Sequence, residues 1–550
     1  MNGAEWLVSE LQGWGVPFIS VLSGNGLNPL LLAAHQRGLR LVDLRNEQAG
    51  SYMADAYARL TGRLGVCAVS SGIAHTNAFA GLLNAQFDGA PLLLITGCSP
   101  AETLGRGGFQ DMDQVAMARP LCKYAALVTE TWRIPQMLGE ALAAATSGRP
   151  GSVHLSIAVD ALSGEFNPAR AISSAPRNTP YSRAAAPQED IAAAARMLAD
   201  ARRPLIVAGS GVFHARGGPA LDAFMRLTAI PAVTPIWDRG PIDAPNGAFL
   251  GVIGAATGEP DLLGTSDLLV LAGARVDYRV RYLDAPPLAA GRRLIRMDVD
   301  PAALGQGAPA DLALLADPAS AFQQLASTWR AAGHRPHTAW LAEARARHAE
   351  YYGRWARERM PVTTFTGWAL VDALRALISD ETVFLVDGGN IGQWAHMLLC
   401  NDRYPGHWLT CGASAVVGWG VAGAMAARLA YPTRPVLLLS GDGSIGFGLL
   451  EFESAARQGL PFVAIVADDR AWGIVATGQQ KAWGHTVVAD IGPIDYAAVA
   501  RALGARGVRA ETATELQAAV REGWQADLPT LIHVPVALGG PAELPADGSH

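Results

Sequence analysis

Short apolar runs that alternate with amphipathic stretches are the feature that most constrains how this chain folds. The clearest apolar runs lie at 18–22, 64–70, 91–97 and 152–157. Helical patterns, such as those at 47–60 and 76–86, separate them. Continuous apolar runs, as opposed to alternating ones, indicate strands buried on both faces, which is typical of parallel sheets covered by helices. The pattern predicts an α/β protein built from doubly wound parallel sheets.

The length of the chain predicts more than one sheet. A single hydrophobic core rarely serves 550 residues, so we expect about three domains. Two stretches look like linkers: 164–188 is rich in Pro, Ser, Ala and Arg, and 330–362 is charged and helical. The predicted units are therefore 1–165, 187–330 and 360–538, followed by a mobile tail at 539–550.

Composition excludes several classes of protein. Half of the residues are hydrophobic and 17% are charged, which excludes a disordered chain. The net charge is −6 and no basic run occurs, so we expect neither nucleic acid nor an anionic membrane as a partner. The chain shows no apolar run long enough to span a bilayer, and no secretory signal. Five scattered cysteines without a CxxC pair favour a cytoplasmic location.

The most informative stretch is 436–475, in which two predicted strands end in acidic residues. The strand VLLLS leads into Gly441-Asp442-Gly443-Ser444, and the next strand leads into Asp468-Asp469. Because the carboxyl ends of neighbouring parallel strands share one edge, Asp442 and Asp469 are expected to converge. Carboxylates beside glycine amides and a helix N-terminus suit Mg²⁺ with a diphosphate. An isolated Asp442 would more simply cap its helix, and the second acidic pair favours the metal site.

These motifs resemble a known family. GDGS followed by DDRAWG is similar to the signature of thiamine-diphosphate-dependent enzymes, closest to acetolactate synthase and benzaldehyde lyase. The resemblance covers nearly the whole chain. It implies three doubly wound parallel-sheet domains: a pyrimidine-binding domain, a central domain and a diphosphate-binding domain, in chain order. It also implies thiamine diphosphate and Mg²⁺ as cofactors.

The resemblance assigns roles to residues at the diphosphate end. The metal ligands would be Asp442, Asp469 and the carbonyl of Ala471. Asp468-Asp469 stands where most relatives have two asparagines, so the added negative charge must be offset by Mg²⁺ or by a neighbour that the sequence does not identify. The loop 411–418 would lie beneath the cofactor, with Val417 bending it. The cofactor-binding residues would be Gly389, Asn390, Ala415, Val417, Gly443, Ser444, Trp472, Gly473, Ile474 and Asn77.

The N-terminal third supplies the expected catalytic residues. Glu47 matches the glutamate with which the family activates its cofactor, and the predicted helix places it near a buried end. Gln110 matches a glutamine that reaches the substrate. The first strand lacks the histidines of related lyases, so His75 is a candidate for proton transfer there. Relatives build each site from two subunits, which implies a homodimer or homotetramer.

The resemblance leaves the reaction partly open. We expect a carbon–carbon lyase or carboligase acting on a 2-oxo acid, an aldehyde or an acyloin. The alternatives are a 2-hydroxyacyl-CoA lyase or oxalyl-CoA decarboxylase, a cofactor-binding homologue without catalysis, and a nicotinamide oxidoreductase built on 204–212. FAD in the central domain is left open but not expected. A CoA ester or ADP would have six arginines available, unless these form only a solvated surface: Arg275, Arg279, Arg281, Arg292, Arg293 and Arg296.

Overall fold

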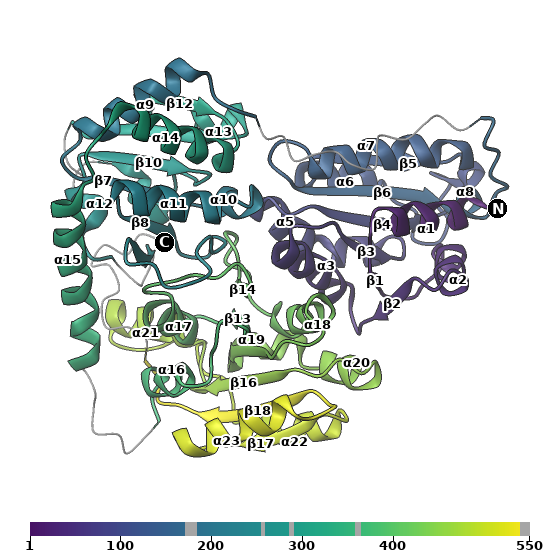
Figure 1. Ribbon diagram of the computed structural model, residues 1–550. Helices are drawn as coiled ribbons and strands as arrows, with labels where there is room; N and C mark the ends of the chain where they lie inside the picture. The colour runs from purple at the N-terminus through teal and green to yellow at the C-terminus, as the bar shows by residue number, and fades with distance from the viewer. Residues whose placement is uncertain (171–183, 255–258, 285–290, 358–364, 540–550) are drawn as a thin grey trace.

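The computed structural model describes residues 1–170, 184–254, 259–284, 291–357 and 365–539. Within these ranges the chain forms three six-stranded sheets, and every strand pairing inside them is parallel. Helices cover the sheets, as the sequence predicts for an α/β fold (Figure 1). The predicted tail at 539–550 lies, from residue 540 onward, outside the described residues.

The first sheet has the strand order β2-β1-β3-β4-β6-β5. Its strands are β1 (Phe18–Val21), β2 (Arg40–Asp43), β3 (Gly65–Val69), β4 (Leu92–Cys98), β5 (Tyr124–Val128) and β6 (Ser152–Ala158). Its helices are α1 (Gly3–Gly13), α2 (Asn28–Gln36), α3 (Glu47–Thr61), α4 (Ile73–Asn77), α5 (Phe79–Asp88), α6 (Gln114–Ala118), α7 (Ile134–Thr146) and α8 (Val159–Ser163). The helix predicted at 76–86 is thus divided between α4 and α5.

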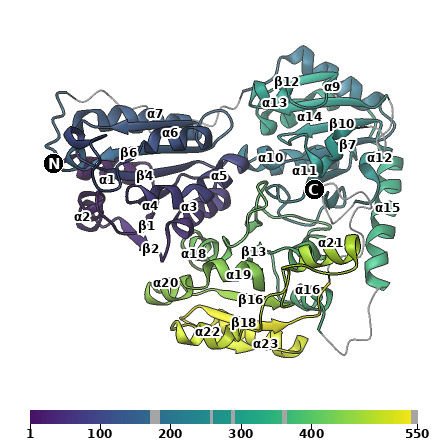
Figure 2. The same cartoon turned by 180° about the vertical axis from the view of Figure 1, so that it is seen from behind.

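The central sheet has the order β12-β11-β10-β7-β8-β9. Its strands are β7 (Pro204–Ala208), β8 (Ala232–Pro235), β9 (Phe249–Ile253), β10 (Leu268–Ala272), β11 (Arg293–Asp298) and β12 (Leu312–Leu315). Its helices are α9 (Gln188–Asp200), α10 (Ser210–His214), α11 (Gly218–Thr228), α12 (Leu262–Thr265), α13 (Pro301–Gly305) and α14 (Pro318–Ala332). Helix α15 (Thr338–Arg357) then runs along one side of the molecule toward the third sheet (Figure 2).

The third sheet has the order β14-β13-β15-β16-β18-β17. Its strands are β13 (Val383–Asp387), β14 (Trp408–Leu409), β15 (Val436–Gly441), β16 (Val463–Asp468), β17 (Arg506–Arg509) and β18 (Thr530–Pro535). Its helices are α16 (Gly367–Arg375), α17 (Asn390–Leu399), α18 (Gly420–Ala430), α19 (Asp442–Gly448), α20 (Glu451–Arg457), α21 (Gly473–Trp483), α22 (Tyr496–Ala502) and α23 (Ala513–Trp524).

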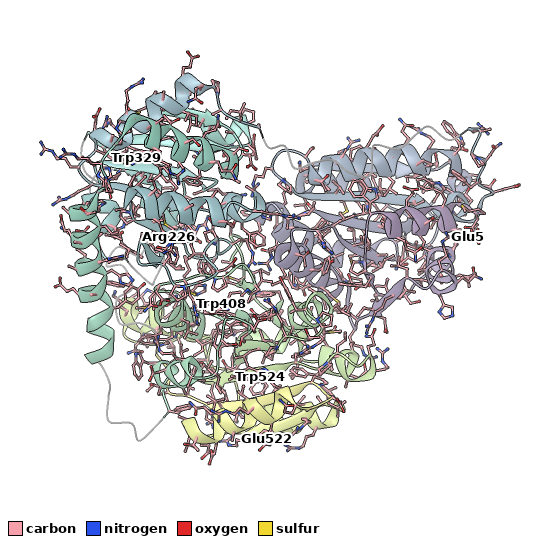
Figure 3. The ribbon with its side chains drawn as sticks, in the orientation of Figure 1. Glu5, Arg226, Trp329, Trp408, Glu522 and Trp524 are labelled. Atoms are coloured by element: carbon pink, nitrogen blue, oxygen red, sulfur yellow. The ribbon has the colours of Figure 1, made fainter. Side chains whose placement is uncertain are left out.

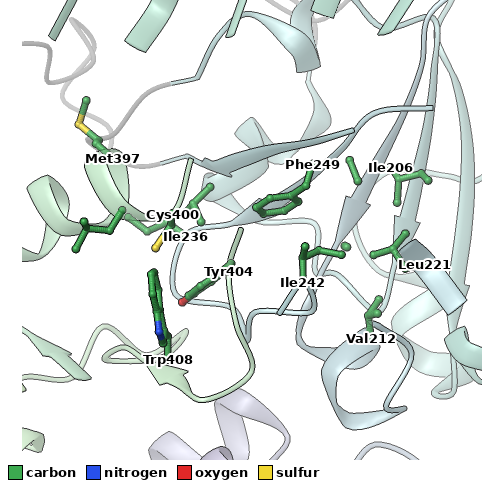
Figure 4. Close-up of a cluster of buried hydrophobic side chains, with 14 of the residues drawn as sticks. Ile206, Val212, Leu221, Ile236, Ile242, Phe249, Met397, Cys400, Tyr404 and Trp408 are labelled. Carbon is green, nitrogen blue, oxygen red and sulfur yellow. The ribbon is translucent and has the colours of Figure 1, made fainter. Parts of the chain in front are cut away.

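The central and third domains share one hydrophobic core. Ile206 and Phe249 of the central sheet belong to the same buried cluster as Met397 and Trp408 of the third domain (Figure 4). The backbones of Ile242 and Tyr404 also pair across this boundary. Trp408 accordingly lies near the middle of the molecule, far from the exposed side chains at its rim (Figure 3). Burial of such large apolar side chains fixes the two domains against each other.

Asp88, at the end of α5, connects all three domains. Buried Arg59 donates to its Oδ2 at 3.2 Å, and the Ala413 amide of the third domain donates to its Oδ1 at 2.7 Å. The His214 ring of the central domain lies 3.0 Å from its backbone oxygen. Arg59 also donates to Asp55 and to the carbonyl of Thr410, so its buried charge is paired with two carboxylates. Across the described residues, no helix combines the length and apolarity needed to cross a bilayer.

Candidate active site

The two acidic motifs meet at the carboxyl edge of the third sheet. Strands β15 and β16 are neighbours, with Gly441 beside Ala467, so Asp442 and Asp469 follow adjacent strand ends. Both side chains line one cavity of about 110 Å³. The convergence predicted from their spacing is therefore present in the fold. We call the residues of this cavity the C-terminal half-site.

Most of the residues predicted to bind a diphosphate line this cavity. Those that do are Gly389, Asn390, Val417, Asp442, Gly443, Ser444, Asp469, Ala471, Trp472, Gly473 and Ile474. Ala415 does not, although it belongs to the same 411–418 loop. Asn77, Glu47, Gln110 and His75 also lie outside it. One chain thus gathers the predicted metal and diphosphate residues but not the predicted catalytic ones.

Unsatisfied polar atoms show what the cavity can hold. Among the described residues, Asp442 Oδ2 and Asn390 Nδ2 are buried and have no hydrogen-bond partner. One is an acceptor suited to a cation, and the other is a donor suited to a phosphate oxygen. A Cβ at Gly473 would lie 2.4 Å from Asp469 Oδ2 and 2.9 Å from Asn390 Nδ2, so a side chain there would fill the space between them. The residues present fit a divalent cation with a diphosphate.

Burial and mutual repulsion shape the acidic groups. The pKa of Asp442 is raised to about 7, first by burial and then by the charges of Asp469 and Asp468. The pKa of Asp469 is raised to about 6, mainly by burial. Asp468 differs: burial opposes its ionisation, but hydrogen bonds, foremost one from His533 at 2.8 Å, bring its pKa below the ordinary value. A bound cation would relieve the repulsion between Asp442 and Asp469.

His533 is the neighbour that the sequence analysis failed to identify. It lies on β18, 65 residues from Asp468, and is 1% exposed. A single His inside an apolar strand carries no local signal for this role. Only the strand order, which places β18 beside β16, brings the two side chains together.

The 411–418 loop is held by Asp387 of its own domain and by Asp88 of the first domain. Asp387 is buried and accepts hydrogen bonds from the amides of Gly418 (3.1 Å) and Gly420 (2.8 Å). Burial raises the pKa of Asp387 to about 7 although these bonds oppose the rise. Gly412 has φ +87°, and a Cβ there would lie 2.3 Å from Asp88 Oδ2. The loop is therefore fixed where Val417 enters the cavity.

Glu47 begins α3 in the first domain. Asn46 caps this helix, accepting a hydrogen bond from the Ala49 amide at 2.7 Å, so the helix start is defined. Asn77, at the end of α4, donates to Glu47 Oε2 at 3.0 Å, and the Glu47 side chain is partly buried. We call Glu47, Asn77 and Gln110 the N-terminal half-site. Its first two members, Glu47 and Asn77, are in contact.

Gln110 contacts the loop that precedes α4, at Ser71 and Gly72. Its backbone is left-handed, with φ 55°, and Ser71 Oγ donates to its Oε1 at 3.1 Å. Gly72 also has a positive φ of 62°, and a Cβ there would lie 2.7 Å from Gln110 Cβ. The glycine therefore permits the close approach of Gln110.

Gln114 is a second residue that the sequence analysis missed. It is 3% exposed, and its Oε1 accepts a hydrogen bond from the Gly72 amide at 2.8 Å. Its Nε2 lies within hydrogen-bond distance of Thr96 Oγ1, the Gly97 carbonyl and Ser156 Oγ. Gln114 thus ties the loop that precedes α4 to the ends of β4 and β6. A Gln at a helix start gave no indication of this in the sequence.

His75 shares α4 with Asn77, but its side chain is buried inside the first domain. Its side chain is 0% exposed and packs against the rings of Phe79 (4.6 Å) and His154 (4.7 Å). Burial lowers its pKa to about 4, so the ring is neutral. The structure does not bring it to Gln110 or Glu47, and its predicted part in proton transfer stays untested.

The six arginines of the central domain do not form one basic surface. Arg279 is buried between Asp238 and Asp277, and Arg281 pairs with Glu259. Only Arg275 and Arg296 of the six line a second cavity, of about 530 Å³, between the first and central domains. Arg149 of the first domain joins them there, and so do several aspartates.

Comparison with known proteins agrees with this geometry. Residues 1–117 match the family model described as thiamine pyrophosphate enzyme, N-terminal TPP binding domain, residues 191–325 match the central domain, and residues 387–534 match the C-terminal TPP binding domain. A protein named 2-hydroxyacyl-CoA lyase 2 from Caenorhabditis elegans is 31% identical over 92% of this chain and 84% of its own. The acetolactate synthase isozyme 2 large subunit of Escherichia coli K12 is 29% identical over 98% of this chain and 96% of its own. The chain belongs to the thiamine-diphosphate-dependent enzymes, in the group close to acetolactate synthase.

Proposed function

We propose that this protein is a thiamine-diphosphate- and Mg²⁺-dependent carbon–carbon lyase or carboligase that acts on a 2-oxo acid, an aldehyde or an acyloin. The observation that carries the proposal is the C-terminal half-site, where Asp442 and Asp469 converge beside an unpartnered Asn390 amide. The described residues of the central domain supply no observation in favour of FAD. A cytoplasmic location stays a prediction.

The residues that would hold the cofactor divide by chemistry. Asp442, Asp469 and the Ala471 carbonyl would bind Mg²⁺, because hard cations prefer oxygen ligands. The amides at Gly389 and Asn390, where α17 begins, would face the phosphates, since a helix N-terminus favours anions. When bound, thiamine diphosphate supplies the carbon nucleophile.

The N-terminal half-site would provide proton transfer and orient the substrate. Asn77 occupies Glu47 Oε2, which leaves Oε1 to hold the proton shared with the pyrimidine of the cofactor. Gln110, braced by Ser71 and Gly72, would orient the substrate. Neither residue lines the C-terminal half-site, so a second copy of the chain would complete each site as a homodimer or homotetramer.

Exposed apolar side chains near both half-sites favour the proposal that a second copy of the chain packs there. Ile73 and Phe109 flank the N-terminal half-site and are 66% and 72% exposed. Phe447, Trp472 and Val475 are also exposed near the C-terminal half-site. Apolar side chains grouped beside two incomplete half-sites are typical of an oligomer interface.

The test is reconstitution with defined substrates. The purified protein, given Mg²⁺ and thiamine diphosphate, would be supplied with pyruvate, acetoin and benzoin, and the release of CO₂ and aldehydes and the formation of new acyloins would be measured. We expect turnover of at least one. Binding of the cofactor without turnover would favour the alternative of a non-catalytic homologue, and failure to bind it would refute the proposal.

A second candidate substrate is a 2-hydroxyacyl-CoA or oxalyl-CoA ester. The favouring observation is the cavity lined by Arg149, Arg275 and Arg296, since arginines suit phosphate groups. The name of the Caenorhabditis elegans relative points the same way. Release of formyl-CoA from such an ester, with no turnover of the free acids, would establish this alternative.

A further inference from the structure

Asp468 is an extra carboxylate that stands at the C-terminal half-site without entering it. Its neighbours in the chain, Ala467 and Asp469, both line the cavity, whereas Asp468 does not. Its Oδ2 lies 2.8 Å from His533 Nε2, and its Oδ1 accepts a hydrogen bond from the Arg470 amide at 3.1 Å. The side chain is 6% exposed. Both of its oxygens thus have partners, His533 and the Arg470 amide, that do not line the cavity, while the Asp468 carboxyl also lies beside that of Asp442.

His533 is itself held firmly. It is 1% exposed and sits on β18, which pairs with β16 so that Val534 lies beside Ala467. Its ring packs edge-on against Tyr496, with centroids 5.4 Å apart and planes at 85°. The Tyr496 hydroxyl in turn donates to the Asp442 carbonyl oxygen at 3.4 Å. The ring nitrogen that faces Asp468 therefore has little freedom to turn away.

We propose that His533 is a positioning residue that holds the Asp468 carboxylate out of the cavity that receives the metal and diphosphate. The inference rests on the proposed function. Asp442 and Asp469 already place two carboxylates where one divalent cation would bind. A third, turned toward the phosphates, would repel them in a poorly solvated space. The hydrogen bond from His533 makes the chain's departure from the usual asparagine compatible with the cofactor.

The experiment is a double-mutant cycle read by calorimetry, with Mg²⁺ and thiamine diphosphate as the titrants. We expect His533→Ala to weaken cofactor binding by about tenfold, a coupling typical of side chains in contact. Asp468→Asn should bind as tightly as the unaltered protein or more tightly. The double variant should return to the affinity of Asp468→Asn, because the carboxylate that His533 restrains is gone.

Two further variants separate this effect from loss of structure. His533→Gln keeps an N–H donor and should bind nearly as well as the unaltered protein, even if His533→Ala folds poorly. His396→Ala removes a ring that is 2% exposed in the same domain and bonds only to its own helix, at Gly392, among the described residues. We expect it to lower the melting temperature without weakening cofactor binding.

The outcomes are distinct. Binding by the double variant as weak as that of His533→Ala would overturn the inference, because the ring would then act through packing. Weaker binding by Asp468→Asn alone would also overturn it, since the carboxylate would belong to the site. If the unaltered protein binds no cofactor, the proposed function fails first; if it binds and all variants bind equally, only the inference about His533 fails.

Discussion

The acidic groups of the C-terminal half-site are buried by their own chain, whereas the N-terminal half-site is more exposed. Asp442 is 4% exposed, and its neighbours come from consecutive strand ends of one sheet. Glu47 is only partly buried, and Phe109 beside Gln110 is 72% exposed. The comparison teaches that one chain by itself organises the groups proposed to bind metal and phosphate. The groups expected to act on the substrate would need a second copy of the chain to complete their surroundings.

Asp442→Ala should abolish both cofactor binding and activity. The substitution removes one of two carboxylates at the cation site and leaves only Asp469 and backbone oxygen. Calorimetry with Mg²⁺ and thiamine diphosphate, together with turnover, measures both effects. Retained cofactor affinity would show that the C-terminal half-site has been misidentified.

Glu47→Ala should leave the fold and cofactor binding intact but lower turnover by about 10² to 10⁴-fold, the usual contribution of a positioned proton-transfer group. Glu47 does not line the C-terminal half-site, so affinity should change little. Steady-state rates and calorimetry on the same preparation check this. Near-normal turnover would remove Glu47 from the mechanism.

Lowering the pH should weaken metal binding. The pKa of Asp442 is raised to about 7 and that of Asp469 to about 6, and both must lose their protons to bind a cation. Between pH 8 and pH 6 we expect about a 20-fold loss of affinity for Mg²⁺ with thiamine diphosphate. Calorimetry at pH 8, 7 and 6 measures it.

The metal-free protein should show the opposite trend in stability. A carboxyl with a raised pKa in the folded state stabilises the fold when protonated, and this contribution is lost as pH rises from about 4 through about 7. Melting temperatures measured without metal across that range provide the check. A melting temperature that does not vary with pH would contradict the raised pKa of Asp442. An affinity for Mg²⁺ with thiamine diphosphate that does not vary with pH would contradict the proposed role of Asp442 and Asp469 as ligands.

Gln114→Met should lower turnover by about tenfold, because it leaves the buried Gly72 amide without its acceptor. Cofactor affinity should stay unchanged, since Gln114 acts on the N-terminal half-site. Gln136→Met, on α7, where the half-buried Gln136 donates a hydrogen bond to Glu140, serves as the control and should alter neither. A rate unchanged in Gln114→Met would make this residue purely structural.

Mixing two inactive proteins tests the need for a second copy. If Glu47→Ala and Asp442→Ala chains are co-expressed, half of the dimers are mixed and each mixed dimer has one intact site, so we expect about a quarter of normal activity. Activity of the mixture is compared with that of each variant alone. No recovery would indicate that both half-sites act within one chain.

The convergence of acidic residues in the C-terminal half-site could be predicted from the sequence, and the contacts of the N-terminal half-site only in part. Asp442 and Asp469 follow apolar strands that are recognisable locally, so their convergence requires only that the strands be parallel neighbours. His533 could not be found this way, because its contact with Asp468 depends on the order of strands across the sheet. Gln114 was missed because its four hydrogen-bond partners come from three separate segments.

The contacts of Asp88 limit how this chain can be recombined with its relatives. A chimaera that exchanges the central domain has to keep a ring at residue 214 that reaches the backbone of α5. One that exchanges the third domain has to keep glycine at 412, because a Cβ there would strike the Asp88 carboxylate. Domain boundaries chosen only by sheet would not guarantee either condition, so crossover points should be judged by compatibility with the backbone and side chain of Asp88.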